Sequence, residues 1–347
     1  MVHGGIGIDA HKRTHTVVAV DEVGRQLGVR VTQATSTAAH LELVRWAGQF
    51  GPERRWAVED CRHLSRRLER DLLAAGETIT RVPPKLMAHA RDSARTYGKS
   101  DPIDALAVAR AALREPDLPS ARLDGPEREL RLLVDHREDL VAERTRLINR
   151  LRWHLHELDP GWDPAPRALN RRKTITAVTA RLESIEGLVA RLAADLTARI
   201  AALTTDINGL EKEIAALTRV LAPALLAVPG AAELTAAKIV AETAGIDRFK
   251  SKDAYARHNG TAPQPAWSAS PRHRLARTGN RQLNCAIHRI AVTQIRCHPD
   301  AQAYLKHRIA ASDTKTEALR ALKRRLSDVV YRALLADATA KPVSQAA

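Results

Sequence analysis

Four acidic residues in the N-terminal part of the chain could act together, although the sequence separates them widely. Asp9 and Glu59 each end a short apolar segment typical of a buried strand, and sites in open α/β sheets gather at the carboxyl ends of strands. Asp101 precedes a proline and can cap a helix, and Asp104 follows on the same helical face. The pattern therefore allows all four carboxylates to converge on one patch.

Such a patch would have the chemistry of a divalent metal site. Carboxylates packed together repel one another by about 4 kcal/mol per pair at ~4 Å and an effective dielectric of ~20. Bound cations remove that cost, and oxygen ligands select Mg²⁺, for which Mn²⁺ can substitute. Two such ions ~4 Å apart can hold a phosphodiester during in-line displacement. In the alternative interpretation, Asp101 only caps a helix, and Glu59 with Asp60 belongs to a solvated loop.

A second candidate site is the polar, basic loop at residues 260–279, which contains Ser268. A serine in such a loop could attack phosphorus, with guanidinium groups stabilising the developing charge. The pattern alone favours a plain phosphate-binding loop in which Ser268 only donates a hydrogen bond. The arginines expected to contact nucleic acid in this loop and just after it are Arg272, Arg274, Arg277 and Arg281.

The charge balance of the 347-residue chain limits its partners. Lys and Arg number 55 against 40 Asp and Glu, a formal net charge of +15, which favours nucleic acid or an anionic membrane surface. Aromatic residues make up only 3%, so affinity is expected from phosphate contacts and not from an aromatic stacking platform. Since we find no transmembrane run, no secretory signal and no CxxC pair among the three cysteines, we expect a cytoplasmic protein without a zinc ribbon or disulfide scaffold.

Residues 1–122 alternate between strand and helix patterns. Three short segments joined by turns predict a β-meander, and two later segments, separated by helical leucine spacing, predict further strands. The expected strands are residues 5–8, 16–20, 25–32, 55–58 and 78–82. This order predicts a mixed α/β domain.

Residues 123–222 carry two long helical patterns, at 125–158 and 174–221. The second sustains heptads typical of a coiled coil. Arg137 and Arg144 occupy apolar-seam positions of the first helix, which is costly unless they pair or meet phosphate, and we expect them to contact nucleic acid. The two helices form either a coiled coil between chains or an antiparallel hairpin within one chain.

Residues 223–337 predict a mainly helical C-terminal domain, and residues 338–347 an unfolded tail. Residues 228–237 suggest a helix-hairpin-helix turn that presents backbone N–H groups to a phosphate. An ordinary helix start explains that segment equally well. The further helices are expected at residues 234–244, 281–296 and 306–335.

Taken in order, these motifs resemble the DEDD transposases of bacterial insertion sequences, the IS-one-ten family. The resemblance covers nearly the whole chain, and its most specific block is Asp101-Pro102-Ile103-Asp104. The other matching blocks are residues 7–12 with His15, Glu59, residues 228–244 and 259–263, Ser268, and residues 277–283.

The resemblance implies an RuvC-like (RNase H-type) N-terminal domain, a coiled-coil segment and a C-terminal domain that holds a serine. It implies that Asp9, Glu59, Asp101 and Asp104 bind Mg²⁺, and that Ser268 becomes linked to a DNA end. It further implies donor and target DNA, a structured guide RNA, and assembly as a homodimer or homotetramer. An acid cluster and a serine separated by long helices could then meet between protomers.

Two departures from the family pattern and three other functions are weighed against this assignment. Ala269 replaces the usual glycine after the serine, which leaves Ser270 as a rival nucleophile. Asp60 and Cys61 follow Glu59 where small residues are commoner in the family, so Asp60 could share the metal role. The alternatives are an RuvC-like junction nuclease without a covalent intermediate, a non-catalytic nucleic-acid-binding protein, and an actin-fold kinase. We find no second phosphate-binding glycine loop to support the kinase.

Overall fold

The computed structural model describes residues 4–52, 54–59, 62–92, 100–115, 118, 120–121, 125–265, 273–274 and 279–340. The chain divides into two compact units, each described by itself below. The N-terminal unit comprises Met1–Asp124, Asp247–His258 and Ala276–Gly279. The helical unit comprises Gly125–Ile246, Asn259–Leu275 and Asn280–Ala347.

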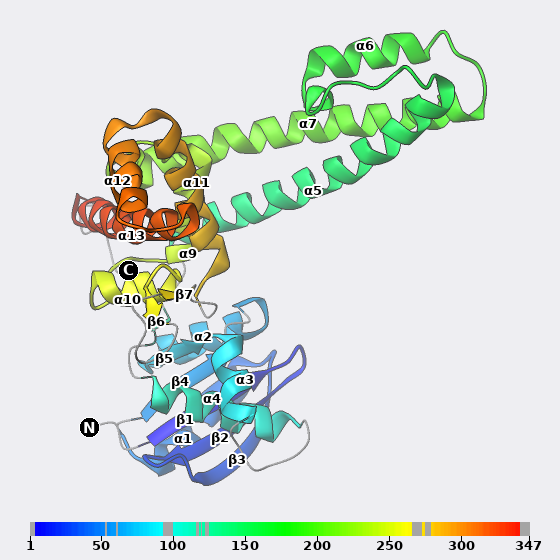
Figure 1. Cartoon of the computed structure of the whole chain (residues 1–347). Helices are drawn as coiled ribbons and strands as arrows, with labels where there is room; N and C mark the ends of the chain where they lie inside the picture. Colours follow the sequence, from blue (N-terminus) through cyan, green and yellow to red (C-terminus); the bar gives the residue numbers. More distant parts are fainter. Residues whose placement is uncertain are drawn as a thin grey trace. The chain divides into compact units, whose positions relative to one another are not determined.

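The N-terminal unit contains a five-stranded mixed sheet in the order β3-β2-β1-β4-β5 (Figure 1). The first three strands form the predicted antiparallel meander, and β4 and β5 extend the sheet parallel to β1. All five predicted strands are therefore confirmed. Their bounds are β1 (Gly4–Ala10), β2 (Thr14–Asp21), β3 (Gln26–Gln33), β4 (Arg54–Glu59) and β5 (Ile79–Val82).

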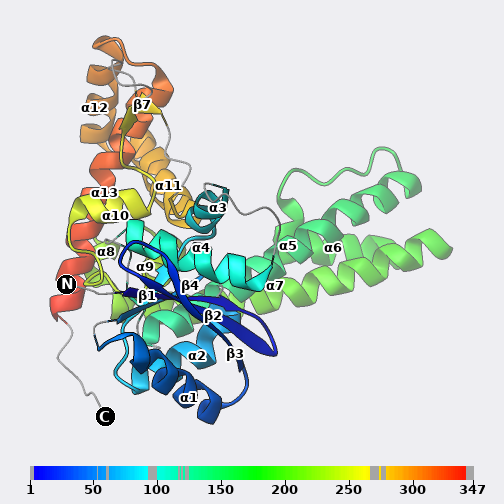
Figure 2. The ribbon, with the colours of Figure 1, turned by 90° about the horizontal axis from the view of Figure 1, so that it is seen from below.

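Helices cover both faces of this sheet (Figure 2). On one face, α1 (Thr37–Ala47), which leads into the short η1 (Gly48–Phe50), and α2 (Arg62–Ala74) pack against Ile6, Ile8 and Trp56. On the other face lie α3 (Pro84–Asp92) and α4 (Asp101–Arg114), with buried side chains that are mostly alanine. Small side chains allow α4 to lie close to the strands, which matters for the site described below.

A buried histidine pair lies beside the sheet. His15 in β2 is fully buried, and its ring centroid lies 5.7 Å from that of His40. His40 in turn forms a 2.7 Å hydrogen bond through Nδ1 with Oδ2 of Asp71. Neither ring nitrogen of His15 has a hydrogen-bond partner among the described residues, so this ring is buried as the neutral form.

The burial of His15 predicts a loss of stability in mild acid. Burial, followed by the proximity of His40 and His11, lowers the pKa of His15 to about 4 from 6.5. As the pH falls, the unfolded chain therefore binds a proton at His15 before the folded chain does. The stability that neutral His15 contributes is fully present above pH 6.5 and is lost as the pH approaches 4. The loss corresponds to about 3 kcal/mol.

Urea denaturation of the wild type and His15→Leu measures this effect. From about pH 7 to about pH 4.5, the wild type should lose most of that free energy relative to the variant. A difference between the two proteins that does not change with pH would contradict the assignment.

The helical unit contains a long antiparallel hairpin formed by α5 (Pro126–Leu158) and α7 (Leu188–Leu221) (Figure 1). Arg137 of α5 donates a hydrogen bond to Glu211 of α7. Arg144 lies one heptad further along α5, and it donates to Thr204, which lies one heptad before Glu211 in α7. Opposite directions of travel along the two helices define an antiparallel pair. Of the two arrangements left open by the heptads, the structure thus forms the hairpin within one chain.

The second long helix is interrupted, which corrects the continuous helix predicted over 174–221. The chain forms α6 (Arg172–Leu182), preceded by the short η2 (Ala168–Asn170), and α7 begins only after Gly187. Gly187 has a φ of 112°, a conformation open to glycine and strained for other residues. The break lets α6 pack alongside α7 and close a core that includes Leu151, Ile175 and Ile200.

Shorter helices complete the helical unit: α8 (Pro223–Leu226), α9 (Glu233–Thr243), α11 (Arg281–Cys297), α12 (Pro299–Ala310) and α13 (Lys315–Ala340). The single basic helix predicted over 306–335 is wrong, because the chain turns between α12 and α13, with Ser312 at a φ of 77°. Helix α13 also continues to Ala340, into the tail predicted for 338–347.

The remaining described elements are α10 (Lys252–His258) in the N-terminal unit and a two-stranded ribbon of β6 (Gln264–Pro265) and β7 (His273–Arg274). The hairpin and the C-terminal helices fall in one unit, and the domain boundary at 222 stays a prediction. Across the described residues, no helix combines the length and apolar character needed to cross a membrane.

Candidate metal site at the end of the sheet

Strand alternation directs two of the predicted acids toward the same helix. Successive side chains of a strand point to opposite faces of the sheet. Ile8 and Val58 are paired in the β1/β4 ladder and pack in the core with α1 and α2. Asp9 and Glu59, the next residue in each strand, therefore belong to the opposite face, which α4 covers.

The close packing of α4 on β1 brings the other two acids to the same place. A Cβ on Gly7 would lie 2.1 Å from the Ala105 carbonyl oxygen, and one on Gly5 would meet the Leu113 side chain at 3.7 Å. The helix therefore runs opposite to the strand, and its first turn lies at the carboxyl end of β1. That first turn carries Asp101 and Asp104.

His11 joins two of these carboxylates. Its Nε2 lies 3.0 Å from Oδ2 of Asp9 and 3.5 Å from Oδ1 of Asp101. The ligand atoms of Asp9, His11 and Asp101 all lie within 4.8 Å of one another, an arrangement that could hold a metal ion. Asp9 is buried and the Asp101 side chain is 57% exposed, so the group opens to solvent on the helix side.

The electrostatics of Asp9 show how crowded the site is. Burial raises the pKa of Asp9, and the charges of Asp104 and Asp101 raise it further, whereas the charge and hydrogen bond of His11 lower it. A buried carboxyl that is repelled by two others is the arrangement that a divalent cation relieves. The carboxylate oxygens among these donors fit both Mg²⁺ and Mn²⁺.

Asp104 and Glu59 lie near this group without belonging to its tightest part. Asp104 is buried, and its Oδ1 accepts a hydrogen bond of 3.1 Å from Nη1 of Arg91 in α3. Glu59 is half-buried at the end of β4, opposite Val82 of β5 in the ladder. Asp60 lies outside the described residues. The strand register and the first turn of α4 thus place the four predicted acids at one end of the sheet, and the closest ligand set is Asp9, His11 and Asp101.

The sequence patterns assigned no role to His11 or Arg91. Asp9 and His11 are two residues apart at the end of an extended strand, a spacing that places side chains on one side, so an Asp-x-His pattern could have indicated the histidine. Arg91 is assigned to the site only by the contact between α3 and α4.

The predicted serine loop lies mostly outside the described residues. Ser268, Ser270, Arg272 and Arg277 lie outside the described residues, and Arg274 is described only by its backbone in β7. Arg281 is exposed at the start of α11. The roles predicted for these residues stay predictions.

Both ends of this loop are held by side-chain amides within the helical unit. Buried Asn259 donates from Nδ2 to Oγ of Ser327 at 2.8 Å, and its carbonyl oxygen accepts from Asn284 at 2.9 Å. Asn280 caps α11 through Oδ1 and donates to Glu242 at 2.7 Å. Two asparagines therefore fix where the loop leaves and rejoins the helices.

Arg137 and Arg144 are used inside the hairpin. Arg137 donates to Glu211 at 3.0 Å through Nε, and Arg144 is buried with Nη1 3.2 Å from Thr204. Burial lowers the pKa of Arg144, and the nearby charge of Arg137 acts in the same direction. Both arginines thus have partners in α7. Their contact with nucleic acid stays a prediction, and it requires these hairpin contacts to break.

The turn predicted as a helix-hairpin-helix lies between α8 and α9. Gly230 has a φ of 86°, and a Cβ there would lie 3.2 Å from the carbonyl oxygen of Ile290 in α11. The Pro229 carbonyl accepts a 2.7 Å hydrogen bond from the side chain of Gln294. This turn is therefore packed against α11, which fits the ordinary structural interpretation of the segment.

Comparison with known proteins defines the class of protein. A family model described as "Transposase", for DEDD transposases of IS110, matches residues 6–160. A second, described as "Transposase IS116/IS110/IS902 family", matches residues 222–306. The two models cover the acid cluster and the chain from α8 into α12, and the class they define is the transposase of insertion elements.

Two curated relatives match over almost their full length. The 44.8 kDa protein of insertion element IS116 from Streptomyces clavuligerus is 31% identical, covering 99% of this chain and 98% of that protein. The 42 kDa protein of IS900 from Mycobacterium paratuberculosis is 29% identical, with 98% of each chain covered. The chain belongs to the IS110/IS116 family of insertion-element transposases, as its motifs predicted.

Similarity in part also extends to solved structures. T. thermophilus RuvC in complex with a Holliday junction substrate is 16% identical and aligns with a TM-score of 0.27, covering 33% of this chain and 94% of that one. Similarity at this level defines neither fold nor function. The mixed α/β character of the N-terminal unit is established by its own sheet.

Proposed function

We propose that this transposase cleaves and rejoins DNA strands with Mg²⁺ held by Asp9, Glu59, Asp101 and Asp104, and with Ser268 as nucleophile. The supporting observation is the convergence of Asp9, His11 and Asp101, whose ligand atoms lie within 4.8 Å of one another. The raised pKa of Asp9 between neighbouring carboxylates supports a cation at this place. Mn²⁺ is proposed to substitute for Mg²⁺.

Bound at these carboxylates, divalent ions would stabilise the charge that develops on a phosphodiester during displacement. The chain's own residues have three tasks in this proposal. Asp9 at the strand end and Asp101 at the start of α4 would supply ligand oxygens, His11 would offer Nε2 as a further ligand beside both, and Arg91 orients Asp104 and compensates its charge. The packing of α4 against Gly7 sets the distance between strand and helix.

Ser268 is proposed to form the covalent link to DNA. Its oxygen would bond to phosphorus as the bond between phosphorus and one bridging DNA oxygen breaks. The hydroxyl proton would pass to solvent or a nearby base, and the departing DNA oxygen would take up a proton. Rejoining would reverse these events with a new DNA hydroxyl, so that no external energy source is consumed.

The partners in this proposal are donor and target DNA and a structured guide RNA, and the active form is a homodimer or homotetramer. The net charge of +15 suits such polyanions. In an oligomer, the serine of one protomer could reach the acids of another. We propose action in the cytoplasm, on DNA of the nucleoid.

Trapping the covalent intermediate tests the proposal. The full-length protein is mixed with labelled donor DNA, RNA transcribed from the same element and Mg²⁺, and is then denatured. A labelled protein band whose DNA-linked peptide maps to Ser268 is the expected result, and Ser270→Ala should still form it. Linkage at Ser270 would reassign the nucleophile, whereas cleavage without any adduct would indicate a junction-resolving nuclease. A protein that binds DNA but neither cleaves it nor binds Mn²⁺ would be a non-catalytic binding protein.

A further inference from the structure

An exposed stripe runs along the solvent side of α5, near the end of the hairpin. It consists of Arg146, Asn149, Arg150 and Trp153, spaced three and four residues apart, so the side chains lie on one helical face. Trp153 is 76% exposed. Nothing in the packing of the hairpin explains this tryptophan, because the core of this region is formed by other residues, including Leu151 and Leu155.

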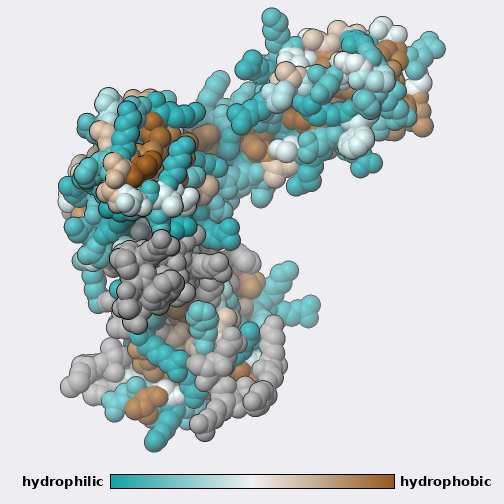
Figure 3. All heavy atoms as spheres, viewed as in Figure 1, coloured by the Kyte–Doolittle hydropathy of each residue, from teal (hydrophilic) through white to brown (hydrophobic). Residues whose placement is uncertain are grey.

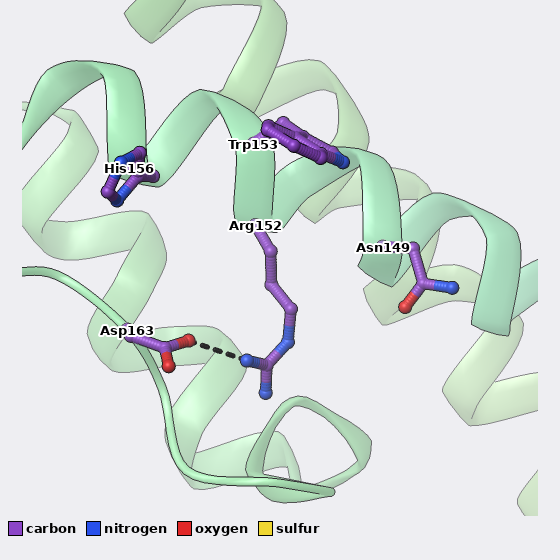
Figure 4. Close-up of a pocket in the computed structure, with 5 residues that line it drawn as sticks. All are labelled: Asn149, Arg152, Trp153, His156 and Asp163. Atoms are coloured by element: carbon purple, nitrogen blue, oxygen red, sulfur yellow. Dashed lines mark hydrogen bonds and ion pairs between the residues drawn. The ribbon is translucent and has the colours of Figure 1, made fainter. Parts of the chain in front are cut away.

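Two hollows flank the stripe, and both are lined by Asn149 and Trp153. One continues to Arg152, His156 and Asp163; the other is lined by Arg146, Arg150 and His154. Figure 4 shows Arg152 pointing away from Trp153 toward Asp163. Open space therefore borders the indole, where a flat group could lie against the ring.

Arg146 and Arg150, the two arginines of the stripe, are available for an anion, whereas Arg152 is not. Arg152 is already bound to Asp163 at 2.5 Å and to the Pro164 carbonyl at 2.6 Å. Arg146 and Arg150 are exposed, and within the described part of the chain neither forms an ion pair. The hairpin face seen in Figure 3 carries hydrophilic side chains interspersed with hydrophobic ones.

An exposed tryptophan beside unpaired arginines and an amide matches the chemistry of an unstacked nucleotide. The indole can stack on a base, the guanidinium groups can contact phosphates, and Asn149 can bond a base edge or a 2′-hydroxyl. Duplex DNA keeps its bases stacked and offers the indole no free ring face. Folded RNA exposes unpaired bases in loops and bulges, and these are the usual targets of aromatic side chains.

We propose that the Arg146–Trp153 stripe of α5 binds an unpaired nucleotide of a folded RNA, with the base stacked on Trp153 and its flanking phosphates at Arg146 and Arg150. This inference rests on the proposed function, because the guide RNA is the partner it deepens. A chain with only 3% aromatic residues offers few side chains for a stacking platform, yet one tryptophan is enough to hold one base.

Binding of two RNA probes tests the stripe. One is a hairpin with a loop of unpaired adenines, and the other is the same stem closed as a perfect duplex. Trp153→Ala should weaken binding of the loop RNA about tenfold, as expected when one stacked base is removed, and should leave duplex binding unchanged. Trp153→Phe should restore most of the affinity, and loop RNA should quench the fluorescence of the wild type more than that of Trp153→Phe.

Two further variants isolate the stripe. Val220→Ala removes an apolar side chain of α7 that is 77% exposed, comparable with Trp153, and should leave the affinity for both RNAs unchanged. The double variant Arg146→Gln/Arg150→Gln should lower the slope of log affinity against log salt by about 1.4, which is about 0.7 for each phosphate that the protein no longer neutralises.

The outcomes separate this inference from the proposed function. Equal binding of loop RNA by the wild type and Trp153→Ala, together with intact DNA cleavage, would overturn the stripe and leave the transposase proposal standing. The stripe would also be overturned if Trp153→Ala weakened loop and duplex binding equally, or if the protein bound single-stranded DNA more tightly than loop RNA. A smaller oligomer for Trp153→Ala would overturn it too, because the stripe would then be a contact between copies.

Discussion

Asp9→Asn should abolish strand cleavage while making the metal-free protein more stable. The substitution replaces a negatively charged carboxylate ligand at the centre of the acid cluster with a neutral amide. We expect the cleavage rate to fall at least about 1,000-fold, which corresponds to a loss of about 4 kcal/mol of transition-state stabilisation. DNA binding should persist, because affinity for DNA comes mainly from phosphate contacts made by basic side chains.

The opposite effect on stability has a separate physical cause. Burial raises the pKa of Asp9, and the charges of Asp104 and Asp101 act in the same direction, so the ionised carboxylate is less favourable in the folded protein than in the unfolded one at neutral pH. A neutral asparagine removes that penalty, and the midpoint of thermal unfolding without divalent ions should rise. Adding Mn²⁺ should stabilise the wild type more than the variant.

Glu22→Gln is a suitable control, since Glu22 is exposed in the turn at the opposite end of β1 and β2 from the cluster. It should retain both activity and metal-dependent stabilisation. Cleavage by Asp9→Asn within tenfold of the wild type would contradict the metal assignment. A lower unfolding midpoint for the metal-free variant would mean that Asp9 is stabilised by contacts rather than strained by its neighbours.

The sequence could predict where the acids lie because local patterns specify strand and helix ends. Apolar segments before Asp9 and Glu59 indicated strands of one sheet, and a proline after Asp101 indicated a helix start. These are short-range signals, and the structure confirms the strands and the helix. The proximity of the acids depends on the strand order and on the position of α4 on the sheet. The sequence indicates that position only through the small residues that permit close packing.

Other parts of the site depend on contacts that no local pattern specifies. The bond of Arg91 to Asp104 requires α3 and α4 to pack together, and the Asn259–Ser327 bond joins residues from distant helices. The heptads correctly indicated a helical pair, but their apolar spacing continues across Gly187, so periodicity alone could not locate the break between α6 and α7. The low aromatic content likewise gave no sign that Trp153 would be exposed among arginines.

Gly7→Ala should destabilise the N-terminal unit and disturb the metal site together. A Cβ at this position would lie 2.1 Å from the Ala105 carbonyl oxygen and 2.6 Å from the Ala109 nitrogen. Both are backbone atoms of α4, so no side-chain rotation can relieve the clash, and the helix must move away from β1. We expect a loss of about 3 kcal/mol in the free energy of unfolding, at the upper end for overpacking.

Gly5 provides a matched control on the same strand, facing the same helix. A Cβ on Gly5 would lie 3.5 Å from Val20 and 3.7 Å from Leu113, both ordinary side-chain contacts, so Gly5→Ala should change stability by less than about 1 kcal/mol. Urea denaturation and Mn²⁺-dependent stabilisation, measured for both variants, would show whether α4 moves. Because Asp101 and Asp104 lie at the start of this helix, its displacement should weaken Mn²⁺ binding in Gly7→Ala alone. If Gly7→Ala were as stable as Gly5→Ala and bound Mn²⁺ equally well, close packing at Gly7 could not be what positions the acids.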